Sequence, residues 1–353
     1  MSQFSAIVLA AGKGTRIKSE TPKVLLPLCG RTLVGHVNEA VVGAGADPVV
    51  FVVRHEREQV VAHLNEINPT AIIADQDDVK GTGRAAWCAL QALPPETTGS
   101  VLVIAGDCPM FTAHSLQELR AVHENSNNAV TVLSAVLDNP YGYGRIVRDA
   151  ANPGETAGTA GSTGNILGIV EEKDATNTQR QIHEVGTSTY VFDLDFLRTA
   201  LDGIGTDNAQ GEMYLTDAIA AAVAAGSGVG SYILPNAIEA AGVNDLVQLA
   251  DLRAAMNRRI QEAWLRTGVR IIDPATTQLD VTVELEPDVV IEPGTVLRGN
   301  TKVARYGVVG PNSELTDVTV AEGARLPHTV ASGVTIDAHQ VTVPFTVLGD
   351  SAR

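Results

Sequence analysis

A strict six-residue period towards the end of the chain constrains its fold more than any other feature. Aliphatic side chains occupy every sixth position without a miss, and glycine and proline punctuate the spaces between them. Such a period is typical of a hexapeptide β-helix, in which each hexapeptide forms one side of a triangular coil. A β-sandwich is the competing interpretation, but its strands alternate with period two. The six aliphatic positions are Leu285, Ile291, Leu297, Val303, Val309 and Leu315. We therefore expect a short left-handed parallel β-helix, with a period that falters after Ala321.

The chain before this region has a different texture, in which short β-branched runs alternate with amphipathic stretches from Ala6 to about Tyr232. The runs are "AIVLAA", "PVVFVV", "TAIIAD", "SVLVIAGD" and "AVTVLSAV". This alternation predicts an α/β, Rossmann-like domain with a mainly parallel sheet and helices on both faces. Ligands of such sheets bind beyond the carboxyl ends of the strands. The glycine loop at Gly12 and "GDCP" at Gly106–Pro109 directly follow strand runs, so both are candidates for that edge.

The length of 353 residues exceeds what one core usually supports, so we expect more than one domain. The predicted limits are 1–236 for the α/β domain, 237–272 for a linker with a long helix, and 273–353 for the β-helix. The linker helix should run from Asn244 or Asp245 to Arg266, because apolar residues recur there at three- and four-residue intervals. The small and polar residues from Arg148 to Ile166 predict an exposed, flexible hairpin tip or insertion.

The segment "LAAGKGTRIKSETPKVLL", Leu9 to Leu26, places four cations around two glycines in a chain whose formal net charge is −16. A strand, a glycine-rich turn and a helix start offer backbone N–H groups to a phosphate. The spacing fits neither a P-loop nor the dinucleotide pattern G-x-G-x-x-G, because position 17 is Ile. A tight turn with surface lysines is the alternative, and the loop alone does not decide between the two.

Composition excludes several classes of function. The acidic balance argues against nucleic acid and anionic membranes as partners. The three cysteines form no disulfide-like pattern, which suits a reducing compartment. The sequence shows no signal peptide and no apolar run of the length of a membrane span. We therefore expect a cytoplasmic protein.

The wider motif set resembles the sugar-phosphate nucleotidyltransferases. "LAAGKGTR", a six-residue spacer and "PKVL" resemble the signature of that family, and "QDDVKGTGRA" resembles its uridine-side loop. "GDCP", "DNPYGYGRIV", "GIVEEKDAT", "DNAQGEMYLTDAI" and "GVNDLVQLADL" follow in the order of the family, before the hexapeptide repeats. This order resembles the bacterial bifunctional enzymes that acetylate glucosamine-1-phosphate and then uridylylate N-acetylglucosamine-1-phosphate. The resemblance covers nearly the whole chain.

The resemblance implies that a sugar-1-phosphate oxygen attacks the α-phosphorus of UTP and that pyrophosphate leaves, which makes UDP-N-acetylglucosamine for envelope polymers. This reaction depends on positioning and charge neutralisation. The N–H groups of the loop at Gly12 and Gly14 would hold the triphosphate. By resemblance, Arg16 faces the leaving pyrophosphate, and Lys23 faces the α-phosphate and the sugar phosphate. Lys18 is at least as well explained as a solvated side chain.

The resemblance also implies a Mg²⁺ site at Asp107 and Asn244, whose oxygen atoms suit that ion. The alternative for Asn244 is a helix N-cap in "NDLVQL", and the alternative for Asp107 is a turn before Pro109. Only the fold can bring these two residues together.

The remaining implied contacts fall on either side of the phosphates. Glu171 can accept hydrogen bonds from sugar hydroxyls, and a glutamine amide can pair with uracil. The base-side residues are Leu9, Ala10, Ala11, Gln76, Gly81 and Thr82. The residues on the sugar and phosphate side are Ala105, Gly106, Gly144 and Glu171, together with Asp107 and Asn244.

Two departures from the family pattern matter. The family has an asparagine in "E-[VI]-N-[TSA]-G", where this chain has Gly186 in "HEVGTSTYVF". A polar contact to the sugar is lost there unless Thr187 or Ser188 replaces it, at a cost of about 1–3 kcal/mol. The acetyltransferase site of the family lies farther along the β-helix than Arg353, so we expect no acetyltransferase activity. Because the family trimerises through its β-helix, the expected assembly is a homotrimer.

Three alternatives stay open. The first is a glucose-1-phosphate uridylyltransferase, which stays possible because Gly186 replaces the asparagine of the family pattern. A degenerate, non-catalytic nucleotide-binding subunit is opposed by the joint presence of Arg16, Lys23, Asp107 and Asn244. A β-helix scaffold explains the repeats but not the cationic loop.

Overall fold

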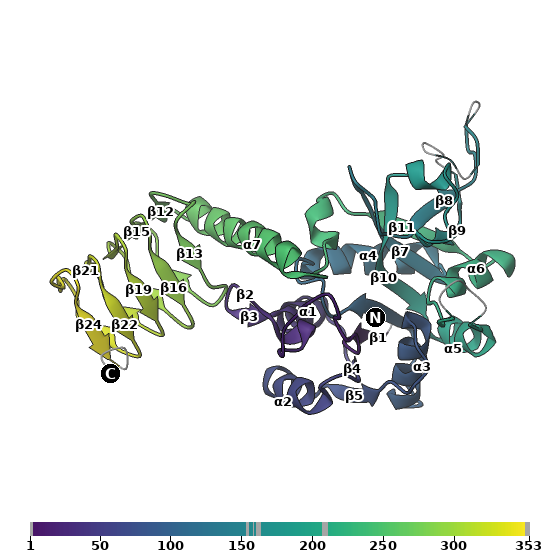
Figure 1. The fold of residues 1–353 in the computed structure, drawn as a ribbon, viewed down its shortest axis with the longest axis horizontal. Coiled ribbons are helices and arrows are strands. Elements are labelled where there is room, and N and C mark those ends of the chain that lie inside the picture. Colours follow the sequence, from purple (N-terminus) through teal and green to yellow (C-terminus); the bar gives the residue numbers. More distant parts are fainter. Residues whose placement is uncertain (1–2, 153–154, 158, 160–163, 207–210, 350–353) are drawn as a thin grey trace. The chain divides into compact units, whose positions relative to one another are not determined.

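The computed structural model describes residues 3–152, 155–157, 159, 164–206 and 211–349. The chain divides into two compact units (Figure 1). The first contains Met1–Leu26 and Leu33–Asp245, and the second contains Pro27–Thr32 and Leu246–Arg353. The domain limits 1–236, 237–272 and 273–353 stay a prediction.

The first unit is built on one mixed sheet. In sheet order its main strands are β11 (Val229–Ile233), β7 (Val130–Val136), β10 (Glu184–Asp193), β6 (Ser100–Ala105), β1 (Phe4–Leu9), β4 (Val49–Val53) and β5 (Ile72–Asp75). The strands β6, β1, β4 and β5 pair in parallel, and so do β7 and β11. β10 runs antiparallel between β6 and β7. A hairpin of β8 (Arg145–Arg148) and β9 (Ile166–Val170) pairs with β10 through β8.

Helices cover both faces of this sheet, because alternate residues of each strand point to opposite faces. One apolar cluster joins Ala6, Val8 and Phe51 to helices on one face, and another joins Ile7, Val50 and Val52 to helices on the other. The first face carries α1 (Leu33–Gly43), α2 (Arg57–Ile67) and α4 (Ala113–Ser126), and the second carries α3 (Thr82–Ala92), α5 (Leu194–Gly203) and α6 (Asp217–Ala224). Short 3-10 turns are η1 (Lys23–Leu25), η2 (Gln179–Gln181) and η3 (Ala237–Ala240). The predicted α/β class is confirmed.

The segment from Arg148 to Ile166 connects two antiparallel strands. Arg148, the last residue of β8, pairs with Ile166, the first residue of β9. The predicted hairpin is therefore present. Part of its tip, at residues 153–154, 158 and 160–163, lies outside the described residues.

The second unit begins with α7 (Leu246–Arg266) and continues as a stack of short parallel strands in three sheets (Figure 1). One sheet holds β12 (Arg270–Ile271), β15 (Val290–Ile291), β18 (Val308–Val309) and β21 (Arg325–Leu326). The next holds β13 (Gln278–Leu279), β16 (Val296–Arg298), β19 (Glu314–Thr316), β22 (Val330–Ser332) and β24 (Val347–Gly349). The third holds β14 (Glu284–Leu285), β17 (Lys302–Val303), β20 (Thr319–Val320) and β23 (Thr335–Ile336). This architecture is consistent with the predicted left-handed β-helix. The short strands β2 (Pro27–Leu28) and β3 (Arg31–Thr32) also belong to this unit.

The six-residue period marks the interior of the β-helix. All six of its aliphatic residues are buried, and Leu315 is fully inaccessible. The next interior side chain is Val320, which is five residues further on, and Leu326, Ala331 and Ile336 continue the series. The β-helix thus extends through sides of five as well as six residues, and the period breaks just before Ala321.

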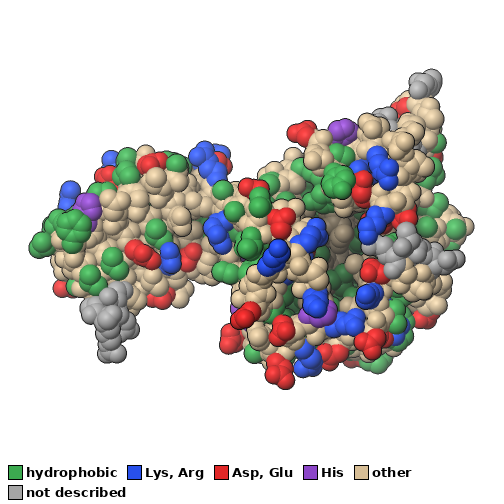
Figure 2. All heavy atoms as spheres, viewed as in Figure 1, with side chains coloured by type: hydrophobic (Ala, Val, Ile, Leu, Met, Phe, Trp, Pro, Cys, Tyr) green, Lys and Arg blue, Asp and Glu red, His purple; other side chains and the backbone are tan. Residues whose placement is uncertain are grey.

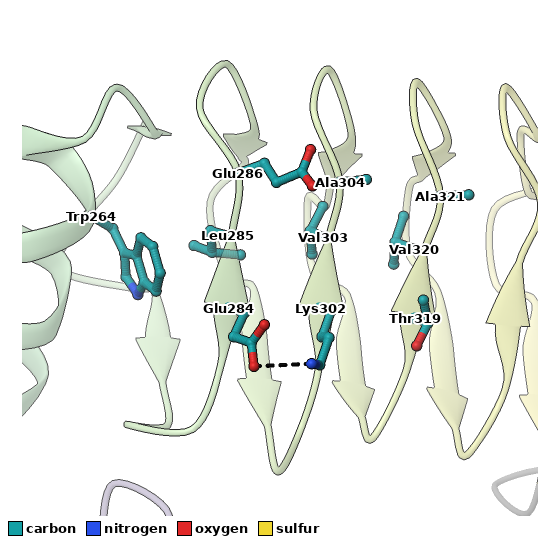
Figure 3. A pocket seen from close by; sticks show the side chains of 10 residues that line it. All are labelled: Trp264, Glu284, Leu285, Glu286, Lys302, Val303, Ala304, Thr319, Val320 and Ala321. Atoms are coloured by element: carbon teal, nitrogen blue, oxygen red, sulfur yellow. Dashed lines mark ion pairs between the residues drawn. The ribbon is translucent and has the colours of Figure 1, made fainter.

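A cavity of about 430 Å³ lies along the row of strands β14, β17 and β20 in this unit. Figure 3 shows Trp264 of α7 at one end of that row and the ion pair between Glu284 and Lys302 on neighbouring strands. The nitrogen and oxygen of this pair are 3.0 Å apart. No residue of the predicted active site lines this cavity.

Candidate active site

The glycine loop and "GDCP" meet at one edge of the sheet. Leu9 and Ala105 are partners at the ends of the adjacent strands β1 and β6. The Gly106 N–H donates to the Leu9 carbonyl at 2.9 Å, and the Ala10 N–H donates to the Val52 carbonyl at 2.9 Å. The two segments therefore share the carboxyl edge where α/β ligands bind, as predicted.

Two cation–oxygen contacts cross this edge. The Lys23 ammonium contacts a carboxylate oxygen of Asp107, which is 84 residues away in sequence. Arg16 Nη2 donates to Asn244 Oδ1 at 2.8 Å across 228 residues. The two contacts are neighbours, because the Val243 N–H donates to the Asp107 carbonyl at 3.0 Å. The fold thus brings Arg16, Lys23, Asp107 and Asn244 together.

Gly14 allows the loop to approach Lys23. Its φ is +62°, in the left-handed region that favours glycine. A Cβ at this position would lie 2.9 Å from the Lys23 Cβ. A larger residue at Gly14 would push Lys23 away from Asp107. Figure 2 shows Lys and Arg side chains gathered around a hollow on this unit, within an acidic chain.

The base-side loop is held from within and from α6. Gln76 Nε2 donates to the carbonyls of Val79 and Gly81, at 3.1 and 3.2 Å. Thr82 Oγ1 accepts from the Leu215 N–H at 3.1 Å, just before α6. Gly81 has a φ of +115°, and a Cβ there would lie 2.2 Å from the Met213 carbonyl oxygen. Only glycine therefore fits at Gly81.

The sugar-side residues also lie together. The Gly186 N–H donates to the Gly144 carbonyl at 2.9 Å. A Cβ on Gly144 would lie 3.5 Å from both carboxylate oxygens of Glu171. Burial raises the pKa of the Glu171 carboxyl, although its 3.5 Å hydrogen bond from the Thr216 hydroxyl acts in the opposite direction. Glu171 is thus a partly desolvated acceptor beside Gly144.

The structure separates the two residues that could compensate for Gly186. Thr187 is buried, and its hydroxyl donates to the Leu133 carbonyl at 2.8 Å, so it is committed to the sheet. Ser188 is exposed and has a φ of +56°. It lies in the irregular part of β10, between Gly186 and Tyr190. Of the two, only Ser188 is exposed, and its side chain forms a hydrogen bond with Tyr190.

Tyr143 directly precedes Gly144 in the chain. Burial is the main cause that raises the pKa of its phenol, and Cys108 and Asp107 act in the same direction. Cys108 itself is buried, which raises the pKa of its thiol well above the usual range. This thiol is poorly suited to act as a nucleophile, so Cys108 is a neighbour of the site rather than a reacting group.

Sequence reasoning missed a set of supporting residues. Arg145 is 2% exposed, and its Nη2 donates to Glu172 Oε2 at 2.7 Å. Arg180 Nε lies 3.4 Å from Glu172 Oε1, the other oxygen of the same carboxylate. The available signal was the arginine in "GYGRIV", which directly precedes two apolar residues in the sequence. A guanidinium buried there needs a charged partner.

This fold and this edge are those of a nucleotidyltransferase, in which the glycine loop and the acidic strand end at Asp107 share the carboxyl edge of the parallel strands. Comparison with known proteins agrees, because residues 6–160 match the MobA-like NTP transferase domain.

Relatives match almost the whole chain. The bifunctional protein GlmU of Paenarthrobacter aurescens is 49% identical over 98% of this chain and 67% of its own length. The GlmU proteins of Kineococcus radiotolerans and Streptomyces coelicolor are 47% and 44% identical, over 99% of this chain and 68% and 70% of their own lengths. The chain spans about two thirds of the length of these relatives.

The chain belongs to the GlmU family of bifunctional proteins. It is a nucleotidyltransferase that produces UDP-N-acetylglucosamine, a precursor of peptidoglycan, from small-molecule substrates. Enzymes of this class generally use a divalent metal. Across the residues that the structure describes, no three His, Cys, Asp or Glu side chains group as a metal site. None of the helices in the described ranges has the length and apolar character needed to cross a membrane.

Proposed function

We propose that the chain catalyses the Mg²⁺-dependent reaction of UTP with N-acetylglucosamine-1-phosphate, which gives UDP-N-acetylglucosamine and pyrophosphate. One observation carries the proposal: Lys23 meets Asp107, and Arg16 meets Asn244, at the strand edge where the glycine loop ends. A purely structural role would not explain why four polar residues from three distant segments converge on a phosphate loop.

The nucleophile is a phosphate oxygen that is already anionic, so it needs no general base. It forms a bond to the α-phosphorus of UTP, and the bond from that phosphorus to the bridging oxygen of the β-phosphate breaks. Pyrophosphate leaves with the electron pair. The protein must bring several anions together and neutralise them, which is the work of Arg16, Lys23 and the loop N–H groups at Gly12 and Gly14.

Asp107 and Asn244 fit a Mg²⁺ ion, because each offers a hard oxygen and water and phosphate oxygens can complete the coordination. Bound there, the ion would neutralise phosphate charge. In the structure, the oxygens of Asp107 and Asn244 are each in contact with a basic side chain. With these oxygens on the ion, the donors of Lys23 and Arg16 would be available for the α-phosphate and for the leaving pyrophosphate.

Uracil recognition is proposed for Leu9, Ala10, Ala11, Gln76, Gly81 and Thr82. The amide nitrogen of Gln76 is engaged in its own loop, so its side-chain oxygen is the atom that can accept from uracil N3–H. The Ala10 N–H is engaged with Val52, so the Ala10 carbonyl and the Ala11 amide remain for the base.

The proposed contacts to the sugar and its phosphate come from Ala105, Gly106, Gly144, Glu171 and Gly186. Glu171 accepts from sugar hydroxyls. Gly186 provides only its backbone, since it has no side chain to contact the sugar. A glucose-1-phosphate enzyme is the second candidate, since Gly186 removes the side-chain contact of the family pattern.

Assembly into a homotrimer through the β-helix and a cytoplasmic location complete the proposal. The stacked parallel sheets support the first part. The three free cysteines support the second, because a reducing compartment keeps thiols unpaired.

Release of pyrophosphate from UTP tests the proposal. It is measured with N-acetylglucosamine-1-phosphate, glucose-1-phosphate or glucosamine-1-phosphate, with and without Mg²⁺. We expect metal-dependent release with the acetylated sugar. Release with glucose-1-phosphate instead would identify that sugar phosphate as the substrate. UTP binding without pyrophosphate release in the presence of any of the three sugar phosphates would identify a non-catalytic subunit.

A further inference from the structure

The turns that carry Gly144 and Glu171 are joined by a charged network that no part of the reaction uses directly. The network consists of Arg145, Glu172 and Arg180. Arg145 directly follows Gly144 at the start of β8, and Glu172 directly follows Glu171 after the end of β9. Each member of the Arg145–Glu172 pair is therefore the chain neighbour of a sugar-side residue.

The contacts of Glu172 fix both turns. Glu172 Oε2 accepts from Arg145 Nη2 at 2.7 Å and from the Gly142 N–H at 3.2 Å. Arg145 Nη1 also donates to the Tyr143 carbonyl, one residue before Gly144. One carboxylate thus binds the backbone and the side chain of the segment Gly142–Arg145.

Arg180 fixes the other side of the network. Its Nε lies 3.4 Å from Glu172 Oε1, and its Nη2 donates to the Glu172 backbone carbonyl at 3.3 Å. The backbone directly after Glu171 is therefore held as well. The network therefore holds the Glu171 carboxylate close to Gly144. Its oxygens lie 3.5 Å from the point where a Cβ of residue 144 would stand.

The energetics argue against a role in stability alone. Arg145 is 2% exposed, and among the described residues its Nε has no hydrogen-bond partner. Burial of a guanidinium costs several kcal/mol, and an ion pair only approximately restores this cost, so apolar residues would stabilise the hairpin at least as well. A buried charge pair that gains little stability but locks a geometry is suited to positioning.

We propose that the Arg145–Glu172–Arg180 network is a positioning device that sets the spacing between Gly144 and Glu171, and so controls affinity for the sugar-1-phosphate but not for UTP. This inference rests on the proposed function of the same site. The three residues act through Gly144 and Glu171 and are not catalytic residues.

The test compares Glu172→Gln with a matched control, Glu184→Gln. Glu184 pairs with Arg148, at the other end of β8, at 2.8 Å and with similar burial. That pair is hydrogen-bonded to Ser134, Ser231 and the Gly164 carbonyl and to neither sugar-side turn. Each substitution removes one carboxylate charge: Glu172→Gln from Arg145 and Arg180, and Glu184→Gln, on β10, from Arg148.

Steady-state kinetics with UTP and N-acetylglucosamine-1-phosphate, together with thermal unfolding, give the outcome. For Glu172→Gln we expect KM for the sugar phosphate to rise about 10-fold, corresponding to one lost order of affinity, with KM for UTP within 2-fold. For Glu184→Gln we expect a similar fall in Tm and unchanged KM values. Equal effects of the two variants on the sugar KM, or equal changes in both KM values of Glu172→Gln, would overturn the inference.

A second variant covers the case in which Glu172→Gln fails to fold. Arg180→Gln removes only the exposed link of the network, since the Arg180 side chain is 41% exposed. It should raise the sugar KM about 3-fold, and Arg180→Lys should restore most of the loss. An unchanged sugar KM in Arg180→Gln would contradict the network. Absence of turnover in the unaltered protein would instead overturn the proposed function, and this inference with it.

Discussion

Of the residues proposed to bind phosphate, we expect Lys23 to matter most, because it contacts Asp107 and lies against Gly14. It is 13% exposed as a side chain, so its charge acts in a partly desolvated site. Charged groups that are already held in position in such a site stabilise the charge of the transition state more than the same groups would in water.

We expect Lys23→Ala to lower kcat/KM by about 100-fold or more, since this is the usual loss when one charge-stabilising donor is removed. The reaction is followed by pyrophosphate release at saturating metal. Lys18→Ala is the matched control, because Lys18 belongs to the same segment and is exposed. Similar losses in the two variants would mean that only the overall charge of the loop matters.

Gly186 offers a gain-of-function test. Gly186→Asn restores the side chain of the family pattern, and one hydrogen bond to the sugar should lower KM for N-acetylglucosamine-1-phosphate about 5-fold. The new Cβ would lie 3.0 Å from Ile169 Cδ1, the far end of a flexible side chain, so the substitution can be accommodated. Gly186→Ala carries the same Cβ without the amide. If both variants have the same KM, the amide makes no contact with the sugar.

Part of the site could be predicted from single residues, and part could not. The grouping of Arg16, Lys23, Asp107 and Asn244 was expected only from the family resemblance, because each residue belongs to one of the quoted motifs; the fold brings them together. The orientation of Gln76 and the commitment of Thr187 to the Leu133 carbonyl were not predictable. Both depend on which of several nearby acceptors the folded backbone presents.

Among the elements, the strands were the most predictable part, because each is a short β-branched run. β1, β4, β5, β6 and β7 overlap the five runs seen in the sequence, and β1 begins two residues before its run. The antiparallel direction of β10 was not predictable, since direction follows from long-range pairing with β6 and β7. The five-residue sides after Leu315 were also missed, because a shortened turn breaks the period without breaking the coil.

A buried histidine between α4 and β7 allows us to predict how the free energy of unfolding depends on pH. His123 of α4 is buried and lies 3.1 Å from Thr131 Oγ1 on β7, and burial lowers its pKa from 6.5 to about 4. The unfolded chain therefore binds a proton at a pH where the folded chain does not. Stability from this residue is complete above about pH 6.5 and is lost as the pH falls towards 4, by up to about 3 kcal/mol.

Urea unfolding at pH 7.5 and pH 4.5 measures this effect. In His123→Gln the fall in unfolding free energy between the two pH values should be smaller by about 2–3 kcal/mol, although the variant is less stable at pH 7.5. Identical pH dependence in the variant and the original chain would show that His123 does not titrate on unfolding.

At the level of assembly, a trimer through the β-helix unit is our proposal. The three sheets of this unit are built from coils stacked in register, so each side repeats along the stack. Most soluble oligomers of identical chains are closed and symmetric.

Light scattering at micromolar concentration should therefore give a mass three times the 37.0 kDa of one chain. The measurement is repeated over a tenfold dilution, because a weak trimer would dissociate and a stable one would not. A mass of one chain at every concentration would contradict the trimer. The pyrophosphate assay is run on the same samples, so that assembly and activity can be compared.

The β-helix has a further consequence for how this molecule can change. Each strand of a sheet pairs only with the equivalent strand of the coil before and of the coil after it. Adding or deleting one whole coil would leave every other coil with neighbours of the same kind. The number of coils is thus a modular quantity, open to evolution or design, whereas the loop at Gly14 and the strand ends around Asp107 tolerate no such change in length.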